Sequence, residues 1–498
     1  MKKRILSLIL SLTLLTGCSA STEENGIVLT GESLLQNTEV TWEMNYEVPT
    51  GNVNVLVDRS GYFPDREKEV CFRGEKLGKT FDLINADTKE VVYTGEITDQ
   101  VYDDASGEYV SHGDFSEVTK EGTYYIETDV IGRSYQFQIG KQVYDDMIRN
   151  MENMFTNVSC MYDETASGGE NTNCPYHEQE SAYSIDSKQI RDISGGWHTD
   201  ASGSKDVTDG CMTMTAMAMA ITYYADVLQS EEPTNEQEKH SMISDMLYEA
   251  DWLLRMQENS GGVYAGVVVD ETANKVTLQP VSYQATASYA GAMAICSQLL
   301  QNYDSNASKT CASSAKKAWG YLVKQNCEDP SARFYAAGWL YRLTGEKNYL
   351  QIINEFMEQE NEPILKNRFA LFGKVAYIST ERKMDTEVCA SIMGEIMDAA
   401  ENTASVSHKD VYYLYSHDMQ VSMERLLIIS IANYVTPSNE YVKVLRNYVH
   451  YLLGRNAGGY QYMNDDGSLV SNQDTTQGTL EWRPILLMTM CGIVDAER

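Results

Sequence analysis

One stretch decides the fold class of most of the chain, Ile243-Ser244-Asp245-Met246-Leu247-Tyr248-Glu249-Ala250-Asp251-Trp252-Leu253-Leu254. Its apolar residues recur at positions i, i+3, i+4 and i+7, the spacing that places them on one face of an α-helix. Similar patterns follow one another after Tyr144, without parallel-strand patterns between them, and predict an all-α barrel or toroid of helical hairpins. They cover residues 207–228, 280–301, 308–325, 332–344, 385–400, 413–434, 438–453 and 481–493.

A different pattern precedes the helices, between Val53 and Gly140. Short runs of β-branched and aromatic residues alternate there with turn residues, at 53–57, 69–72, 80–84, 91–93, 122–126 and 135–139. Strands at this spacing within about 90 residues are typical of a β-sandwich of immunoglobulin type. The sequence therefore predicts a β + α multidomain chain, with an immunoglobulin-like β-sandwich over residues 46–142 and an all-α barrel over residues 143–498.

The N-terminus has the pattern of a secreted lipoprotein. Three basic residues precede the apolar run 5–15, which is too short to span a bilayer. The run ends in Leu15-Thr16-Gly17-Cys18, which resembles the lipobox of bacterial lipoproteins. We expect residues 1–17 to be a signal peptide, Cys18 to be lipidated and residues 18–45 to be a tether, so that the protein is extracytoplasmic and lipid-anchored to the bacterial cell membrane. An ordinary signal peptide followed by a chance cysteine is the alternative.

The charge of the chain excludes one class of partner. The formal net charge is -33, and removal of residues 1–17, which contain three basic and no acidic residues, gives -36. A chain this acidic is not expected to bind nucleic acid or anionic lipid surfaces. Nine cysteines beyond Cys18 are scattered singly, which argues against a disulfide scaffold and suggests small buried side chains for most of them.

Several motifs, taken in order, resemble glycoside hydrolase family 9, a family that includes many cellulases. The resemblance covers nearly the whole mature chain. It implies an (α/α)6 barrel preceded by the family's immunoglobulin-like module, and a polysaccharide or oligosaccharide as partner, since the family hydrolyses β-1,4-glucans with inversion. The matching segments are residues 60–64, 114–116, 122–124, 137–140, 192–198, 252–257, 261–264 and 451–456.

The resemblance also locates the site, where the essential carboxylates are replaced. Inverting hydrolysis needs a carboxylate base and a carboxylic acid on opposite faces of the sugar. Aligned without gaps after Gly195-Gly196-Trp197-His198, the chain has Thr199 and Ser202 where the family has two aspartates. A shift of one residue restores Asp200 as the first aspartate but puts Gly203 at the second. The family's base is therefore absent in either alignment.

The family's acid is a glutamate in a C-terminal segment. Setting Trp482 on the family's tryptophan puts Gln477 at the acid position and Glu481 directly before the tryptophan. Glutamine can hydrogen-bond a glycosidic oxygen but has no proton to deliver. Residues 457–476 also lack the family's His-His-Arg segment, which holds the sugar. Loss of one general acid or base typically costs about 10² to 10⁴ in rate, so we expect impaired hydrolysis.

Other carboxylates could take over the chemistry. Asp200 with Glu481 is the best candidate for a rewired catalytic pair. The alternative is that Asp206 and Asp209 begin the next helix, where negative charge suits the helix dipole, and that Glu481 begins the last one. A hydrolase with displaced carboxylates, a non-catalytic glycan-binding lipoprotein and a protein scaffold therefore remain as hypotheses, and the substitutions favour the second over the first.

A second group of residues predicts a metal. Cys160, Cys174, His177 and His198 are of the type and number that a tetrahedral structural zinc needs. Some members of the family bind zinc beside the active site through two cysteines and two histidines, so the resemblance implies zinc here. The family has cysteine directly followed by histidine, whereas two residues separate Cys174 from His177. A Cys160–Cys174 disulfide is the alternative. The abundant carboxylates leave calcium sites undetermined.

Aromatic residues beside the motifs are candidates for stacking on sugar rings. Trp197 and Trp482 flank the two halves of the site, and we expect them to bind substrate. The segment Tyr415-Ser416-His417-Asp418 opens a helix that faces the cleft in the family. Helix capping by Ser416 or Asp418 and a functional role are both compatible with this position.

Overall fold

In the computed structural model, the described residues are 53–151, 154–155, 158–160, 181–183, 190–200, 202–228, 242–270, 275–359, 367–464, 469 and 479–497. The predicted segments 1–17 and 18–45, with Cys18, lie outside them, as do Cys174, His177 and Gln477. In the described part of the chain, no helix is both long and apolar enough to cross a membrane.

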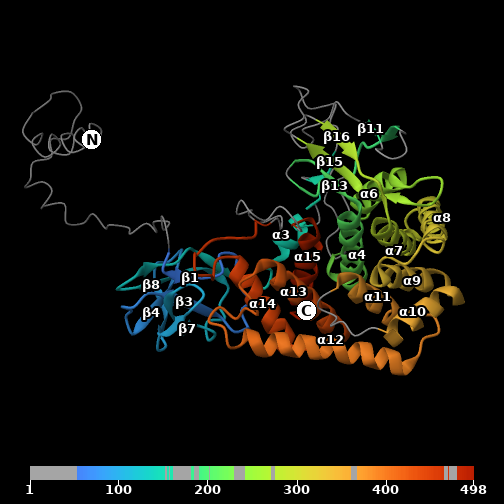
Figure 1. Ribbon diagram of the computed structural model, residues 1–498. Helices are drawn as coiled ribbons and strands as arrows, with labels where there is room; N and C mark the ends of the chain where they lie inside the picture. Colours follow the sequence, from blue (N-terminus) through green and yellow to red (C-terminus); the bar gives the residue numbers. More distant parts are fainter. Residues whose placement is uncertain are drawn as a thin grey trace, which may run out of the picture. The chain divides into compact units, whose positions relative to one another are not determined.

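The first domain is the predicted β-sandwich, with two sheets packed face to face (Figure 1). Its core contains Phe72, Phe81 and Ile126, all at most 1% exposed. One sheet has the order β1 (Val55–Leu56), β3 (Glu69–Arg73), β7 (Glu108–Asp114) and β6 (Val101–Asp103). The other has the order β2 (Gly61–Tyr62), β10 (Phe137–Ile139), β8 (Gly122–Thr128), β4 (Thr80–Asn85) and β5 (Val91–Glu96), with β9 (Gly132–Arg133) paired to β8.

All six runs predicted as strands contain strands, but the sequence pattern missed others. The longest missed strand is β7, in which Ser111, His112 and Gly113 interrupt the apolar pattern. Gly113 is required by packing between the sheets, because a Cβ there would lie 2.4 Å from the Phe81 ring. Gly113, a residue type that usually indicates a turn, therefore lies within the core of the sandwich.

The second domain is a barrel of inner and outer helices, as the resemblance implied (Figure 1). The inner helices are buried on nearly every side, which is why their sequences are apolar all round. They are α4 (Val207–Tyr223), α7 (Tyr283–Leu300), α9 (Pro330–Thr344), α11 (Arg368–Ile378), α13 (Met419–Val435) and α15 (Thr479–Asp495).

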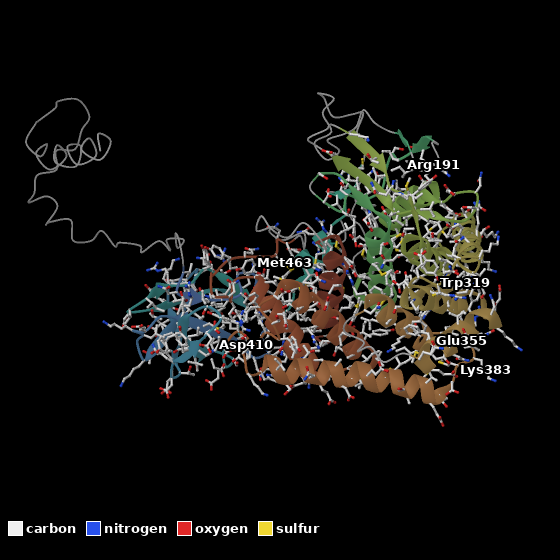
Figure 2. The ribbon with its side chains drawn as sticks, in the orientation of Figure 1. Arg191, Trp319, Glu355, Lys383, Asp410 and Met463 are labelled. Carbon is white, nitrogen blue, oxygen red and sulfur yellow. The ribbon has the colours of Figure 1, made fainter. Side chains whose placement is uncertain are left out.

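The outer helices bury one face only. On α10, for example, only Tyr349 and Ile353 are fully buried, and Trp319 of α8 (Figure 2) packs edge-on against Tyr349 with ring centroids 5.1 Å apart. The outer helices are α3 (Asp145–Met151), α6 (Met242–Met256), α8 (Ser305–Leu322), α10 (Lys347–Gln359), α12 (Thr386–Ser407) and α14 (Asn439–Leu452). A short helix, α5 (Ala225–Leu228), follows α4.

The order of the helices explains where a site can form. Inner helix α4 packs against α7 and α15, α9 packs against α7 and α11, and α12 contacts both α11 and α13. Because inner and outer helices alternate along the chain as hairpins, the inner helices run in one direction and their N-termini gather at one end of the barrel. Side-chain caps begin several of them, from Asp206, Ser282, Asp329, Asn367 and Asp418.

Strands of a small sheet lie around this end of the barrel. The order is β13 (Lys205–Asp206), β15 (Gly266–Asp270) and β16 (Lys275–Leu278), and β13 leads directly into α4. Two further pairs join β11 (Ser181–Tyr183) to β12 (Ile190–Asp192) and β14 (Val263–Tyr264) to β17 (Val281–Ser282). These short strands hold the loops that precede the inner helices.

The sandwich and the barrel meet along α14 and the loop before α13. The backbone N of Arg59 donates to Leu453 O at 3.0 Å, and the Tyr413 hydroxyl donates to Glu69 Oε1 at 2.9 Å. Tyr413 has a φ of +62°, uncommon for a residue with a side chain, which directs it toward the sandwich. Arg455, 1% exposed, adds an ion pair to Glu69 at 3.6 Å.

Candidate active site

The Gly195-Gly196-Trp197-His198 segment rests on helix α6. Gly196 O accepts a hydrogen bond from Cys160 N at 2.9 Å, which ties the segment to the chain before it. Gly196 has a φ of +80°, and a Cβ there would lie 2.6 Å from the ring of Trp252 on α6. Only glycine fits a position with both constraints. The two glycines of this motif therefore allow the loop to pack closely on α6.

The side chain of Glu249 on α6 contacts the same loop and helix α4. Its Oε2 accepts a hydrogen bond from Trp197 N at 2.8 Å, and its Oε1 fills the space that Gly210 of α4 leaves, where a Cβ would lie 2.5 Å away. Burial raises the pKa of Glu249 to about 8, against the opposing effects of the Trp197 hydrogen bond and Lys205. The carboxyl is therefore mostly protonated at neutral pH, and its role is to hold the loop against α4.

Asp200 organises the loop between this motif and α4. Its Oδ1 accepts hydrogen bonds from Ser202 N at 2.9 Å, Ser202 Oγ at 2.6 Å and Ser204 N at 3.0 Å. Burial acts to raise the pKa of Asp200, but these donors outweigh burial and hold that pKa below its usual value. Asp200 is therefore ionised at neutral pH, with one carboxylate oxygen outside these three bonds. A held, ionised carboxylate has the properties of a general base.

The hydroxyl groups at the family's aspartate positions have structural partners. Thr199 Oγ1 donates to Ser204 O at 3.2 Å and accepts from Asp206 N at 3.2 Å. Ser202 Oγ lies 2.8 Å from Ser204 Oγ as well as bonding to Asp200. Thr199 and Ser202 thus hydrogen-bond within the segment around Asp200.

Asp206 and Asp209 begin α4 next to this loop. Asp206 caps the helix, since its Oδ1 accepts from Asp209 N at 3.0 Å. The Asp206 side chain is solvent-exposed, yet enough protein surrounds it that lost hydration raises its pKa. Burial and the neighbouring charge of Asp206 raise the pKa of Asp209, and Arg368 opposes them. The capping role foreseen for Asp206 is confirmed, and both carboxyls retain a proton more readily than Asp200.

Glu481 lies at the start of α15 in a buried ion pair with Arg368 of α11. Glu481 is 1% exposed, and within the described chain neither of its oxygens accepts a hydrogen bond. Burial lowers the pKa of Arg368, while the negative charges of Asp209 and Glu424 raise it. Arg368 at the start of α11 is therefore paired with Glu481 at the start of α15 and lies within the electrostatic reach of Asp209 on α4 and Glu424 on α13. A buried carboxylate that is neutralised by arginine is poorly suited to donating a proton.

The two tryptophans predicted to bind sugar are buried. Trp197 is 1% exposed and stacks on Phe155 with ring centroids 4.3 Å apart, and Trp482 is 4% exposed. Stacking on a sugar requires an open ring face, so in this structure both rings serve the core. They were expected to bind substrate because they flank the motifs, but sequence adjacency does not report which way a ring points.

Tyrosines take the exposed positions near the loop before α13. Tyr460 is 55% exposed and lies 6.2 Å, between ring centroids, from Tyr462, which stacks on Tyr451 at 5.9 Å. Tyr460 and Tyr462 lie in the segment 457–476, where the family's His-His-Arg was expected and is absent, whereas Tyr451 belongs to α14. Asp418 caps α13 by accepting from Val421 N at 3.0 Å, so the capping role is confirmed for Asp418.

Cys160 is disulfide-bonded, and its partner lies outside the described residues. A sulfur in a disulfide is not available as a thiolate ligand for zinc. Of the predicted zinc ligands, the structure otherwise describes only His198, for which burial and Lys205 lower the pKa to about 4 and keep the imidazole neutral. Because Cys174 and His177 lie outside the described residues, the Cys2His2 zinc site stays a prediction, as does its alternative, a disulfide between Cys160 and Cys174.

Sequence reasoning missed Arg368 and Glu249. Arg368 begins α11, a helix that carries no amphipathic pattern because eight or more of its residues are buried. Asn367 directly before it is a helix-capping residue, and this signal could have located the helix. Glu249 lies in the predicted helix 243–254 on the flank of its apolar face, three residues after Met246 and four before Leu253, where a charged residue type gives no signal of burial.

Comparisons with known proteins agree with this geometry. Residues 152–473 match the family described as glycosyl hydrolase family 9, and residues 51–133 match the cellulase N-terminal ig-like domain. Endoglucanase D from Acetivibrio thermocellus is 25% identical, over 94% of this chain and 77% of its own length. A cellodextrinase from Butyrivibrio fibrisolvens is 21% identical, over 83% of this chain and 85% of its own length.

Solved structures show the same fold. A metagenome-derived glycoside hydrolase family 9 endoglucanase superposes with a TM-score of 0.78 at 18% identity, covering 88% of this chain and 98% of that one. A Zn-binding triple mutant of the family 9 endoglucanase J30 superposes with a TM-score of 0.71 at 25% identity, covering 80% of this chain and 84% of that one.

Proposed function

The chain belongs to glycosyl hydrolase family 9, and on that premise we propose that it binds a β-glucan at the N-terminal ends of the inner helices and hydrolyses it with a relocated pair of carboxylates. The relatives named endoglucanase and cellodextrinase support a β-linked glucan as the substrate class. The start of α4 supports the location, because Asp200 lies in the loop that leads into this inner helix and Asp209 lies in its first turn.

The observation that carries this proposal is the opposite direction of two pKa shifts. Hydrogen bonds from Ser202 and Ser204 hold the pKa of Asp200 low, whereas burial and Asp206 raise the pKa of Asp209. Carboxyl groups whose environments separate their pKa values can act as base and acid at the same pH. Asp200 is the proposed base that activates water, and Asp209 is the proposed acid that protonates the leaving oxygen.

Glu481 has a different role in this proposal from the acid expected at first. Its ion pair with Arg368 compensates the arginine's charge beside Asp209. Without Glu481, Arg368 would stabilise the ionised form of Asp209 more strongly and make that group a weaker proton donor. Glu481 is therefore a positioning residue that acts through Arg368.

Binding without hydrolysis is the second candidate function. Thr199 and Ser202 replace the family's aspartates and are engaged in hydrogen bonds within the loop, which favours this candidate. In that case the protein would hold a glycan on the cell surface and hydrolyse it slowly or not at all. We place the protein outside the cytoplasm on a lipid anchor at Cys18, a proposal that rests on the apolar run and the Leu15-Thr16-Gly17-Cys18 sequence.

A panel of variants separates these candidates. Purified residues 19–498 would be incubated with cello-oligosaccharides and mixed-linkage glucans, with reducing-end release and calorimetric binding measured together. Relocated catalysis predicts that Asp200→Asn and Asp209→Asn each lower the rate about 10² to 10⁴-fold with binding retained. Asp398→Asn, an exposed carboxylate on outer helix α12, is the matched control. Binding without release in the wild-type chain would support the second candidate, and unaltered rates in both variants would exclude the proposed pair.

A further inference from the structure

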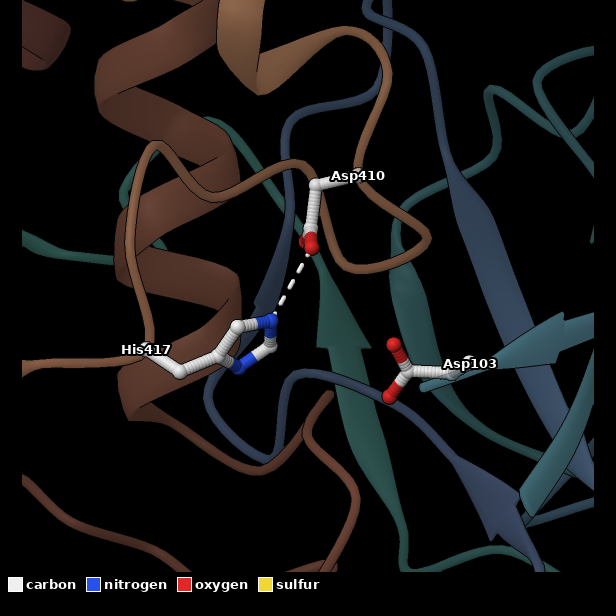
Figure 3. A group of neighbouring side chains, drawn as sticks. All are labelled: Asp103, Asp410 and His417. Atoms are coloured by element: carbon white, nitrogen blue, oxygen red, sulfur yellow. Dashed lines mark hydrogen bonds and ion pairs between the residues drawn. The ribbon is translucent and has the colours of Figure 1, made fainter. Parts of the chain in front are cut away.

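Three potential metal ligands meet where the sandwich contacts the barrel. Asp103 ends strand β6 of the sandwich, whereas Asp410 and His417 lie in the loop between α12 and α13. One ligand atom from each residue lies within 4.8 Å of the other two. Figure 3 shows the Asp103 carboxylate facing the imidazole of His417, with Asp410 hydrogen-bonded to that ring, and Figure 2 places Asp410 on the barrel at its border with the sandwich.

Backbone hydrogen bonds hold the two carboxylates in place. Asp410 Oδ1 accepts from Tyr412 N at 2.9 Å and from Leu414 N at 3.0 Å, which leaves Oδ2 to face His417 Nε2 at 3.0 Å. Asp103 accepts from Ala105 N at 3.3 Å and Ser106 N at 3.0 Å. The ligand atoms are therefore positioned by the fold, and metal binding would need little rearrangement of the backbone.

Two buried hydroxyl groups in the segments that carry Asp103 and Asp410 lack a hydrogen-bond partner among the described residues. They belong to Ser106 and Tyr412. Tyr412 is 0% exposed, and its hydroxyl lies within the electrostatic reach of Asp103. A buried hydroxyl without a partner costs about 1 to 3 kcal/mol, so such groups commonly mark a bound water or ion.

Charge points to a cation as the missing partner. Asp103 is only 7% exposed, and within the described chain it forms no ion pair with lysine or arginine. A histidine binds a metal as the neutral imidazole, so with a metal bound at His417 the three ligands together would carry two negative charges at the border of the two domains. A divalent cation would compensate both charges, and its bound water could satisfy the Ser106 and Tyr412 hydroxyls.

Distances and ligand types select the class of ion. Neighbouring ligands of a tetrahedral zinc, each about 2.1 Å from the metal, are about 3.4 Å apart. Asp410 Oδ2 and His417 Nε2 are hydrogen-bonded at 3.0 Å, so the metal would replace the proton between them with a small outward shift of the two atoms. Imidazole with carboxylates suits zinc and similar transition metals, whereas calcium prefers oxygen ligands alone.

We propose that Asp103, Asp410 and His417 bind one divalent transition-metal ion that fastens the sandwich to the loop before α13. The site shares no residue with the cysteine and histidine group around Cys160. The loop that it would fix carries Tyr415 and leads to the cap of α13, so the ion would position one side of the candidate active site. The proposal does not depend on whether the chain hydrolyses glucan.

Equilibrium dialysis against zinc tests the proposal. The purified chain would be stripped with chelator and dialysed against a fixed concentration of free zinc, and bound zinc would be counted by mass spectrometry. Asp103→Asn and His417→Gln are each expected to bind one zinc fewer per chain than the wild type. Asp104→Asn, an exposed neighbour of Asp103, serves as the control and should match the wild type. Any zinc bound near Cys160 is the same in all four proteins, so it cancels when the zinc count of a variant is subtracted from that of the wild type.

A thermal measurement accompanies the zinc count. Zinc should raise the midpoint of unfolding of the wild type and of Asp104→Asn, and should raise it less in the two ligand variants. His417 is exposed enough that His417→Gln is expected to fold, so the test survives if Asp103→Asn does not. Equal zinc counts in the wild type, His417→Gln and Asp104→Asn would overturn the proposal.

Discussion

Asp58 of the sandwich accepts a hydrogen bond from His450 Nδ1 of helix α14 at 2.7 Å, with both side chains buried. The same carboxylate oxygen accepts from the Tyr144 hydroxyl at 2.8 Å. The other oxygen accepts from Ser60 N at 2.7 Å and Gly61 N at 3.0 Å. One buried carboxylate therefore joins the sandwich, the segment that follows it and the barrel.

Removal of this contact should destabilise the whole chain. His450→Ala leaves Asp58 with fewer donors in a buried site, and we expect the free energy of unfolding in urea to fall by at least about 2 kcal/mol. His408→Ala is the matched control, because His408 pairs with Glu440 on the surface and should contribute less than about 1 kcal/mol. Equal losses in the two variants would contradict the assignment.

The same pair has a predicted pH dependence. Burial lowers the pKa of His450 despite the opposing effect of Asp58, so the folded chain keeps this imidazole neutral below the ordinary pKa of 6.5. As pH falls below 6.5, the unfolded chain gains a proton that the folded chain resists, and stability is lost. The stability difference between the wild type and His450→Ala should therefore shrink as pH falls from 7.5 to 5.5.

Gly196 should tolerate no side chain. Gly196→Ala combines a positive φ with a Cβ 2.6 Å from Trp252, and we expect a loss of about 2 to 4 kcal/mol in the free energy of unfolding. Gly394→Ala is the control, since Gly394 lies within α12 and its Cβ would meet nothing within 4 Å. That change should stabilise the chain by about 0.5 to 1 kcal/mol. Calorimetric unfolding of both variants would show opposite signs.

The raised pKa of Glu249 predicts that the folded chain loses stability as the pH rises. Its folded pKa of about 8 lies above its ordinary value of 4.5, so the unfolded chain releases a proton that the folded chain retains. Glu249→Gln keeps the shape of the protonated carboxyl and has no such dependence. Relative to the wild type, this variant should gain stability between pH 5 and 8, by up to about 1.4 kcal/mol per pH unit.

The exposed Glu355 of α10 (Figure 2) provides the control for that measurement. Glu355→Gln makes the same chemical change at the surface, so the contribution of Glu249 is the difference between the two variants over the same pH range. A pH-independent difference for Glu249→Gln would show that this carboxyl is ionised in the folded chain.

The disulfide at Cys160 can be counted directly. Residues 19–498 contain nine cysteines, and one disulfide leaves seven thiols for alkylation in denaturant without reductant. A chain that instead bound zinc through Cys160 and Cys174 would release all nine thiols with one equivalent of zinc. Seven thiols is the predicted result, and nine thiols would show that Cys160 is not in a disulfide.

The sequence predicted most of the fold because its apolar periodicities are local. The long helices α4, α6, α7 and α12 carry regular patterns and caps, and each lies where a pattern was found. Helix α11 was missed because it is both buried all round and only 11 residues long, whereas α4 and α7 are similarly buried but extend over 17 and 18 residues. Strand β7 was missed because it contains Gly113, and the reason for a glycine there is its close contact with the ring of Phe81, which is distant in sequence.

The candidate site was predicted less completely, and for a related reason. Asp200 could be found because it lies in a recognisable motif, but its ionisation depends on Ser202 and Ser204, whose contacts require the folded loop. The partner of Glu481 is Arg368, more than a hundred residues away. Trp197 and Trp482 were expected at the substrate because of their position in the sequence, whereas burial is set by packing.

A time course of cellohexaose hydrolysis followed by proton NMR tests the central claim most directly, because it reports both cleavage and the anomer formed first. The account predicts that the wild-type chain releases product with inverted anomeric configuration and that Asp200→Asn reduces release at least about 100-fold. Asp398→Asn should match the wild type. Absence of product from the wild-type chain, or equal rates for the wild type and Asp200→Asn, would contradict the claim that relocated carboxylates carry out hydrolysis.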